Sequence, residues 1–331
     1  MKRIIDGGAG AAVTRRSLVG GALACGLVRP AAAADDYPSR PVRFVLGYAA
    51  GSGPDLISRF FADRLKTHLR TVVVENKPGF GGNLGADQVA RSKPDGYTLH
   101  PTGGTSLAAA PAIYRNVPFD VRRDLVMVAM FARQPTLLVV GHTSPAKTLA
   151  ELSQILREKG DRGRWGSAIP TARVLGALYQ QSIGVKAVEV QYKTSADWIA
   201  DLNAGSLDFA FIDAASGLGH ARQNRIRPLA GSSGQRTAAI PDVPAMREGG
   251  VDIDVSSWWC VYAPAQTPDA ILDKLHGWID AEVRSPEAKA FLANIGNDPW
   301  SMTRAEAQAY HLEEVDRWAH YAKVAGIEPQ G

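Results

Sequence analysis

Near its N-terminal end the chain passes three times from an apolar, β-rich stretch into a group of glycines and then into a helix-like segment. In the first instance, residues 42–46 predict a buried strand. Gly47, Gly51 and Gly53 follow, and glycine lets the backbone turn sharply and approach a ligand closely. Repeated strand–helix units predict an α/β fold with mostly parallel sheets covered by helices.

The first glycine loop leads into a helix that Pro54 and Asp55 are suited to open. We expect Leu56, Phe60 and Leu65, with Phe61 alongside, to form its apolar face. The unpaired N–H groups of the loop and of the first helical turn would form a cup for an anion. At this point an ordinary tight turn between strand and helix explains the stretch equally well.

Two further glycine loops follow, at residues 77–86 and 102–106. The second loop does not match the dinucleotide pattern G-x-G-x-x-G, because Leu84 stands at the third glycine position. Asn83 can cap the next helix or contact a ligand. The third loop combines glycines with small hydroxyls. Because parallel strands end at one edge of a sheet, the three loops together predict a binding site at that edge.

The N-terminal segment has the layout of an export signal. Residues 14–19 form a twin-arginine pattern around Arg15 and Arg16, and an apolar stretch at 18–28 and small residues up to Ala34 follow. We predict a signal peptide at 1–34 and a periplasmic mature protein. A retained signal anchor is an alternative, and lipidation at Cys25 is a weaker one.

Removal of residues 1–34 makes the protein electrically neutral. This segment holds five of the 37 basic residues and one of the 33 acidic residues, which leaves 32 of each. The neutral balance argues against nucleic-acid binding. Cys260 is the only cysteine after Ala34, so no internal disulfide or thiolate metal cluster is expected. The seven histidines follow no metal-binding spacing, and we predict neither a metal nor a cofactor.

The remaining pattern alternates strands and helices over the whole chain. Expected strands or apolar runs lie at 71–76, 97–100, 125–130, 136–140, 164–167, 187–192, 207–212, 226–231 and 258–262. Expected helices lie at 84–91, 149–159, 173–181, 195–203, 268–279, 285–294 and 303–324. No linker separates two domains, so we place the crossings between two α/β lobes near 131–136 and 226–233.

Several stretches resemble the Bug (TctC-like) family of substrate-binding proteins of tripartite tricarboxylate transporters. The matching stretches are 37–43, 51–59, 74–85, 94–99, 192–193, 201–208, 241–244 and 258–268. The resemblance implies a two-lobed periplasmic binding protein of type II, a Venus flytrap, with residues 35–133 and 228–331 in lobe 1 and 134–227 in lobe 2. It also implies a carboxylate ligand, held by loop N–H groups, hydroxyls and waters, and a membrane transporter or sensor as partner of a monomer.

The chain departs from the family pattern in its loops. Gly47 and Ala50 replace the usual proline-rich start of the first loop, and Pro54 replaces a threonine. The loop at 166–173 lacks a second glycine and a histidine and adds Arg173, which is either a solvated helix-end residue or a ligand contact. Loop identity sets the ligand, so its class (dicarboxylate, tricarboxylate, aromatic or amino acid) stays open.

The predicted ligand contacts combine loop donors with aromatic walls. Asp213 would orient a ligand hydroxyl, amine or water, or cap the next turn. Trp258 and Trp259 would wall the pocket or belong to the core, and one of the two must face the other way. The full predicted set is Tyr48, Gly51, Ser52, Gly53, Asp55, Asn83, Thr102, Gly103, Thr105, Ser106, Ser167, Ala168, Tyr192, Asp213 and Trp258.

The rival function is an exported α/β enzyme, a hydrolase or transferase acting on a carboxylate in the same cleft. Such an enzyme needs an activated nucleophile or a general base. Gly231–Gly234 does not match the nucleophile elbow G-x-S-x-G, and no triad is evident. The pattern therefore favours binding without catalysis.

Overall fold

A computed structural model describes residues 36–168, 170–192 and 195–329. Residues 37–331 form one compact unit. The predicted signal peptide and its twin-arginine pattern lie outside the described residues. Within the described ranges, no helix combines the length and apolar character needed to span a membrane.

Three parallel strands form the first strand group, and each is followed by a glycine loop. In this group β1 pairs with both neighbours, Val42 opposite Val72 and Arg43 opposite Thr98. The strands are β1 (Val42–Leu46), β2 (Val72–Asn76) and β3 (Thr98–Gly103). The following helices are α2 (Gly53–Arg64), α3 (Lys66–Leu69), α4 (Asn83–Ala90) and α5 (Gly104–Ile113), with a 3-10 turn at Phe80–Gly82. The carboxyl ends of the strands, and with them the three loops, share one edge as predicted.

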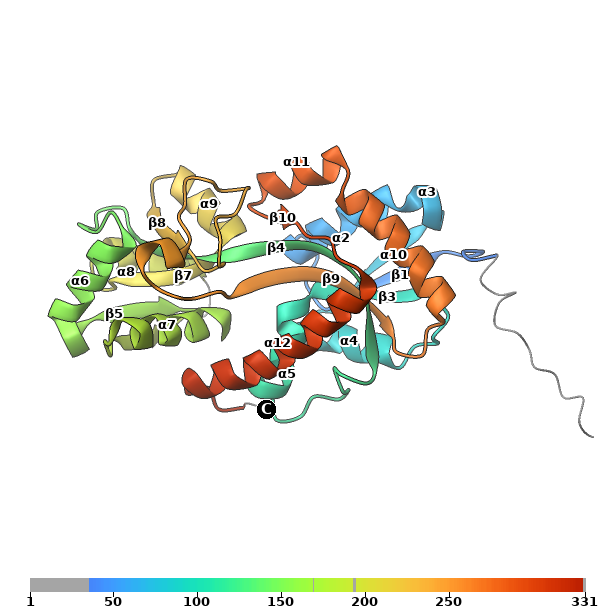
Figure 1. The fold of residues 1–331 in the computed structure, drawn as a ribbon, viewed down its shortest axis with the longest axis horizontal. Coiled ribbons are helices and arrows are strands. Elements are labelled where there is room, and N and C mark those ends of the chain that lie inside the picture. Colours follow the sequence, from blue (N-terminus) through green and yellow to red (C-terminus); the bar gives the residue numbers. More distant parts are fainter. Residues whose placement is uncertain (1–35, 169, 193–194, 330–331) are drawn as a thin grey trace, which may run out of the picture. The chain divides into compact units, whose positions relative to one another are not determined.

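The long strand β4 (Leu125–Gly141) joins this group to the second one. Its residues up to Pro135 pair antiparallel with β9 (Ser256–Pro264), and those from Thr136 pair with β7 and β8. β9 also pairs with β3, which places it inside the sheet. In Figure 1, β4 and β9 run side by side between the two groups. The short β10 (Asp298–Pro299) adds to β4.

The second strand group consists of strands β5 to β8. β5 pairs parallel with β6 and β7, whereas β7 and β8 both run antiparallel to β4. Its strands are β5 (Arg164–Ser167), β6 (Val188–Gln191), β7 (Phe209–Asp213) and β8 (Ile226–Gly231). Its helices are α6 (Leu149–Lys159), α7 (Pro170–Ile183), α8 (Ser195–Asn203) and α9 (Ala214–Arg222), with 3-10 turns at Gly160–Arg162 and Met246–Gly249.

Each strand group has apolar cores that fix the strand ends. In the first group Phe61 stacks on Phe131 of β4, with ring centroids 4.3 Å apart. In the second group Trp165 stacks on Phe209 at 5.8 Å. The C-terminal helices α10 (Asp269–Val283), α11 (Pro286–Asn294) and α12 (Arg304–Val324) complete the fold, and α12 packs on α5, β4 and α7.

The α/β fold class is confirmed, and the sheet is mixed because β4 and β9 run antiparallel to their neighbours. The two apolar runs expected at 125–130 and 136–140 are one strand of 17 residues. β3 extends to Gly103 because residues from His100 onward pair with β9. Of the apolar face expected for α2, Phe61 and Leu65 are buried and Phe60 packs against the same core, whereas Leu56 is half exposed and Ile57 is buried instead.

The strand pairing bears on where the chain crosses between the predicted lobes. β4 changes partners between Pro135 and Thr136, inside the first predicted crossing at 131–136. β8 pairs with the second part of β4, and Val255 belongs to the same apolar core as Leu229. Residues 226–231 and Val255 thus pair or pack with the second part of β4, and the return crossing at 226–233 stays a prediction. The division into two lobes itself stays a prediction.

Candidate functional site

A cavity of about 500 Å³ lies beside the edge where the glycine loops meet. The first strand group contributes Tyr48, Gly53 and Ser106 to its wall, and the second contributes Thr171 and Asp213. Residues from both strand groups therefore face one space. A ligand in this cavity would contact both groups at once.

The three glycine loops meet around Tyr48. A Cβ atom built on Gly47 would lie 2.0 Å from the carbonyl oxygen of Gly82, so the first and second loops touch through their backbones. A Cβ on Gly103 would lie 3.1 Å from the Tyr48 hydroxyl, which itself donates to Ser106 Oγ at 3.2 Å. Glycine at these positions lets the three loops approach one another.

Two helices begin at the cavity without a side-chain cap. The N-cap residues are Ser52 for α2 and Gly103 for α5, and neither side chain accepts a hydrogen bond from its helix. Gly53 of α2 and Thr105 of α5 line the cavity. The first N–H groups of a helix lack intrahelical partners and carry partial positive charge, so both helix ends suit an anionic group.

Asp55 stabilises the first loop from behind. Its side chain is only 2% exposed, and it accepts hydrogen bonds from the Gly51 N–H, from Arg59 Nε and from Asn76 Nδ2. Burial would raise the pKa of Asp55, but the hydrogen bonds from Arg59, Asn76 and Gly51 outweigh it and lower the pKa. Asp55 therefore remains charged and fixes the loop, and it does not line the cavity.

In the second strand group, Asp213 faces the cavity at the end of β7. It caps α9, because its Oδ1 accepts from the Ser216 N–H at 2.9 Å. The capping role that the sequence suggested is thus present together with exposure to the cavity.

Two other predicted contacts of this group bind acidic side chains instead. Ser167 Oγ donates to Glu189 at 2.5 Å, and Arg173 Nε pairs with the same carboxylate at 2.9 Å. The Tyr192 hydroxyl donates to Asp201 at 2.6 Å. Burial and the Asp201 carboxylate raise the pKa of Tyr192 to about 12.

Both tryptophans of β9 border the cavity. Trp258 is fully buried, and its ring occupies the space beside Gly104. Trp259 is half buried, stands edge-on to Tyr48 with ring centroids 6.5 Å apart, and donates from Nε1 to Asn297 at 3.0 Å. The predicted set of ligand contacts contains Trp258 only, although both tryptophans are candidates for the pocket wall. Trp259 lies opposite Gly103 in the strand pairing. This position follows from the register of β3 and β9, which the sequence does not show.

The structure brings seven of the predicted contacts to the cavity wall: Tyr48, Gly53, Gly103, Thr105, Ser106, Asp213 and Trp258. The other eight do not line it: Gly51, Ser52, Asp55, Asn83, Thr102, Ser167, Ala168 and Tyr192. Asn83 is the first residue of α4, and Gly82, with a left-handed φ of 101°, takes the cap position expected of Asn83. The sequence missed Gln134, Thr171, Trp259 and Asn297, which come from four separate segments.

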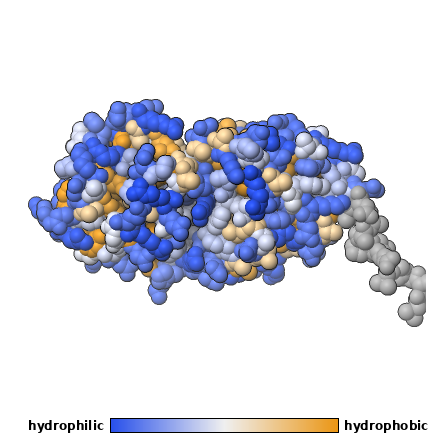
Figure 2. All heavy atoms as spheres, turned by 45° about the horizontal axis from the view of Figure 1, so that its top comes forward, coloured by the Kyte–Doolittle hydropathy of each residue, from blue (hydrophilic) through white to orange (hydrophobic). Residues whose placement is uncertain are grey.

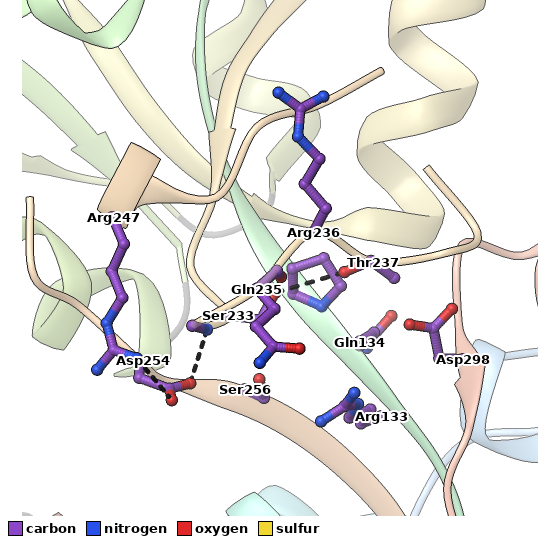
Figure 3. A pocket seen from close by; sticks show the side chains of 12 residues that line it. Arg133, Gln134, Ser233, Gln235, Arg236, Thr237, Arg247, Asp254, Ser256 and Asp298 are labelled. Atoms are coloured by element: carbon purple, nitrogen blue, oxygen red, sulfur yellow. Dashed lines mark hydrogen bonds and ion pairs between the residues drawn. The ribbon is translucent and has the colours of Figure 1, made fainter. Parts of the chain in front are cut away.

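A smaller, polar hollow of about 170 Å³ lies beside the partner change of β4 (Figure 3). Arg236 pairs with Glu248 and Arg247 pairs with Asp252. Asp254 accepts from the Gly234 N–H. Because most of its charges are compensated by neighbours, this hollow is a weaker candidate for an anion.

A third hollow, of about 570 Å³, is more open and lies at α10 and α12. Its Arg304 pairs with Asp269 and Asp273. The face shown in Figure 2 is mostly hydrophilic, with hydrophobic residues in separate small groups. No cluster of three or more metal-ligating side chains occurs in the described residues.

Residues 57–327 match the family model described as the tripartite tricarboxylate transporter family receptor. The chain belongs to this receptor family. Curated relatives of this receptor include a protein of Bordetella bronchiseptica that is 32% identical over 91% of this chain and 90% of the relative. The protein BugT of Bordetella pertussis is 30% identical over 92% of this chain and 94% of its own.

Solved structures similar to this receptor are periplasmic binding proteins. The R. palustris protein Rpa4515, solved with adipate, is 29% identical and has a TM-score of 0.77. The match covers 89% of this chain and 100% of Rpa4515. The periplasmic binding protein BugD is 27% identical with a TM-score of 0.72 and covers 89% and 100%. The predicted family and the binding-protein fold are therefore confirmed.

Proposed function

We propose that this receptor is an exported periplasmic protein that captures a small carboxylate-bearing solute and delivers it to a tripartite tricarboxylate transporter. One observation carries the proposal. The uncapped N-termini of α2 and α5 open onto one cavity that residues of both strand groups line. Such helix ends bind an anion through neutral N–H donors without an arginine.

The relatives support the carboxylate ligand, the periplasmic location and the class of membrane partner. The R. palustris protein was solved with adipate, a carboxylate, and BugD is a periplasmic binding protein. The family description names a transporter receptor, which supplies the class of membrane partner. We expect the protein to be a monomer. We also expect it to close on the ligand, because ligand contacts in both strand groups would favour a closed state.

We assign the carboxylate to the first strand group. Its expected donors are the N–H groups of Gly53, of Asp55 and of residues 104–106, together with the hydroxyls of Ser106 and Tyr48. A hydrogen bond to a charged group contributes roughly 1.5–3 kcal/mol, so a few such donors suffice for micromolar affinity.

A double variant tests this assignment. Ser106→Ala removes a donor, and Gly53→Phe fills the mouth of the cavity, where a Cβ atom on Gly53 would meet nothing within 4 Å. We expect the double variant to keep the melting temperature of the unliganded protein and to lose the thermal stabilisation that a panel of carboxylic acids gives the native chain.

The matched control is Gly277→Phe, at an exposed position of α10 where a Cβ atom also meets nothing within 4 Å. It should respond to the acids as the native chain does. Ligand-induced stabilisation that survives in the double variant would place the carboxylate elsewhere.

Binding without turnover is the second part of the proposal. Calorimetry with the acid that binds should give saturable heat, and esters and thioesters of the same acid should remain intact. Product formation by purified protein would instead support the rival hydrolase or transferase function.

Export through the twin-arginine route is the third part. Arg15→Lys and Arg16→Lys together should leave the full-length chain in the cytoplasm, whereas Lys2→Arg and Arg3→Lys should not. Cell fractionation measures the outcome, and periplasmic recovery of the Arg15 and Arg16 double variant would argue for another export route.

A further inference from the structure

Among the described residues that line the cavity, Asp213 is the only one with a charged side chain at neutral pH. A cavity that accepts a carboxylate would ordinarily gain from a cation, and a second negative charge in it repels the ligand. The ligand must therefore have a feature that makes Asp213 favourable in this cavity.

No side chain of the described residues forms an ion pair with Asp213. Its one hydrogen bond from the described residues comes from the backbone N–H of Ser216. His220 lies on the same helix, and burial together with Arg225 lowers its pKa, so it adds no positive charge at pH 7. Arg173, the nearest candidate cation in the sequence prediction, pairs with Glu189.

The two strand groups offer the ligand opposite polarity. The first presents the partly positive N-termini of α2 and α5, which lack side-chain caps. The second presents a carboxylate that already caps α9, so the N–H groups of that helix are less available to an anion. A molecule that touches both groups meets donors at one end and an acceptor at the other.

Much of the cavity wall is apolar. Leu56, Ile57, Ala109, Ile113, Trp258 and Trp259 contribute to it. Burial of apolar ligand surface there is favourable.

We propose that the ligand is a zwitterionic acid with a carboxylate at one end, an apolar body, and a protonated amine that binds Asp213 at the other end. This inference rests on the proposed function and specifies its ligand class. It distinguishes the receptor from one for dicarboxylates, because a second carboxylate would face Asp213.

Two matched series of acids test the proposal by calorimetry. The first consists of ε-aminocaproate, caproate and adipate, and the second of p-(aminomethyl)benzoate, p-toluate and terephthalate. Within a series the body is constant, and the far end changes from an aminomethyl group to a methyl group to a carboxylate. We expect the native chain to bind the amine member of at least one series at least about tenfold more tightly than the other two members.

The variant Asp213→Asn connects this preference to the residue. Asparagine also caps helices well, so the variant should fold, and its melting temperature checks this. We expect the preference for the amine member to disappear and the dicarboxylate member to gain affinity. Asp120→Asn is the control, because Asp120 is exposed, accepts from the Arg122 N–H and lies outside the cavity wall.

The outcomes separate this inference from the proposed function. Tightest binding of a methyl or dicarboxylate member, or an unchanged preference in Asp213→Asn, would overturn the inference and leave carboxylate capture standing. If none of the six acids and no acid of the wider panel bound the native chain, both proposals would fall.

Discussion

Gly104 and Trp258 share a space that holds only one side chain. A Cβ atom on Gly104 would lie 1.8 Å from Cζ3 of the buried Trp258 ring. Gly104→Ala should therefore lower the free energy of unfolding by about 3 kcal/mol, the upper part of the range for overpacking. Urea unfolding measures the change.

The control for this prediction is Gly277→Ala, in the exposed interior of α10. Alanine is favoured over glycine in a helix by about 1 kcal/mol, so this variant should be stabilised. A Gly104→Ala protein as stable as the native chain would mean that the Trp258 ring can move aside.

At the scale of single elements, the strand–loop–helix units were predictable because their signals are local. Glycines after an apolar run indicate a strand end wherever they occur, and Gly53 and Gly103 lie at the cavity as expected. Asp55 shows the limit of such signals. Its residue type favours the first turn of a helix, but the structure turns its side chain back onto Arg59 and Asn76.

The missed contacts belong to elements whose orientation depends on distant partners. Gln134 lies on β4 one residue before the partner change, and Asn297 reaches Trp259 from beyond α11. Neither position carries a local signal, because register and the packing of remote helices decide which side chains face the cavity. Ser167 and Tyr192 lie off the cavity wall, and Glu189 and Asp201 accept their hydroxyl hydrogens.

At the scale of the whole molecule, buried histidines make stability depend on pH. His100 links β3 to β1 by donating from Nδ1 to the Val45 carbonyl at 2.7 Å. Burial lowers the pKa of His100 from 6.5 to about 4. Between these values the unfolded chain binds a proton that the folded chain does not, so stability is lost as the pH falls from 6.5 to 4.

We expect His100→Asn to reduce this loss by about 1.4 kcal/mol per pH unit, the slope for one proton. Asparagine can still donate to Val45, and urea unfolding at several pH values gives the slope. The exposed His142→Asn is the control and should keep the native slope. An unchanged slope in His100→Asn would assign the acid sensitivity to other groups. His311 is the first of these to test, because burial lowers its pKa to about 4.

The partner change of β4 has a consequence for exchanging parts between relatives. The chain that builds the second strand group is continuous from Thr136 to Val255, and it enters and leaves through the neighbouring strands β4 and β9. Two junctions, at 135–136 and 255–256, therefore suffice to transplant that segment as a cassette. A chimera made in this way would keep the glycine loops of one parent and receive from the other the residue at position 213.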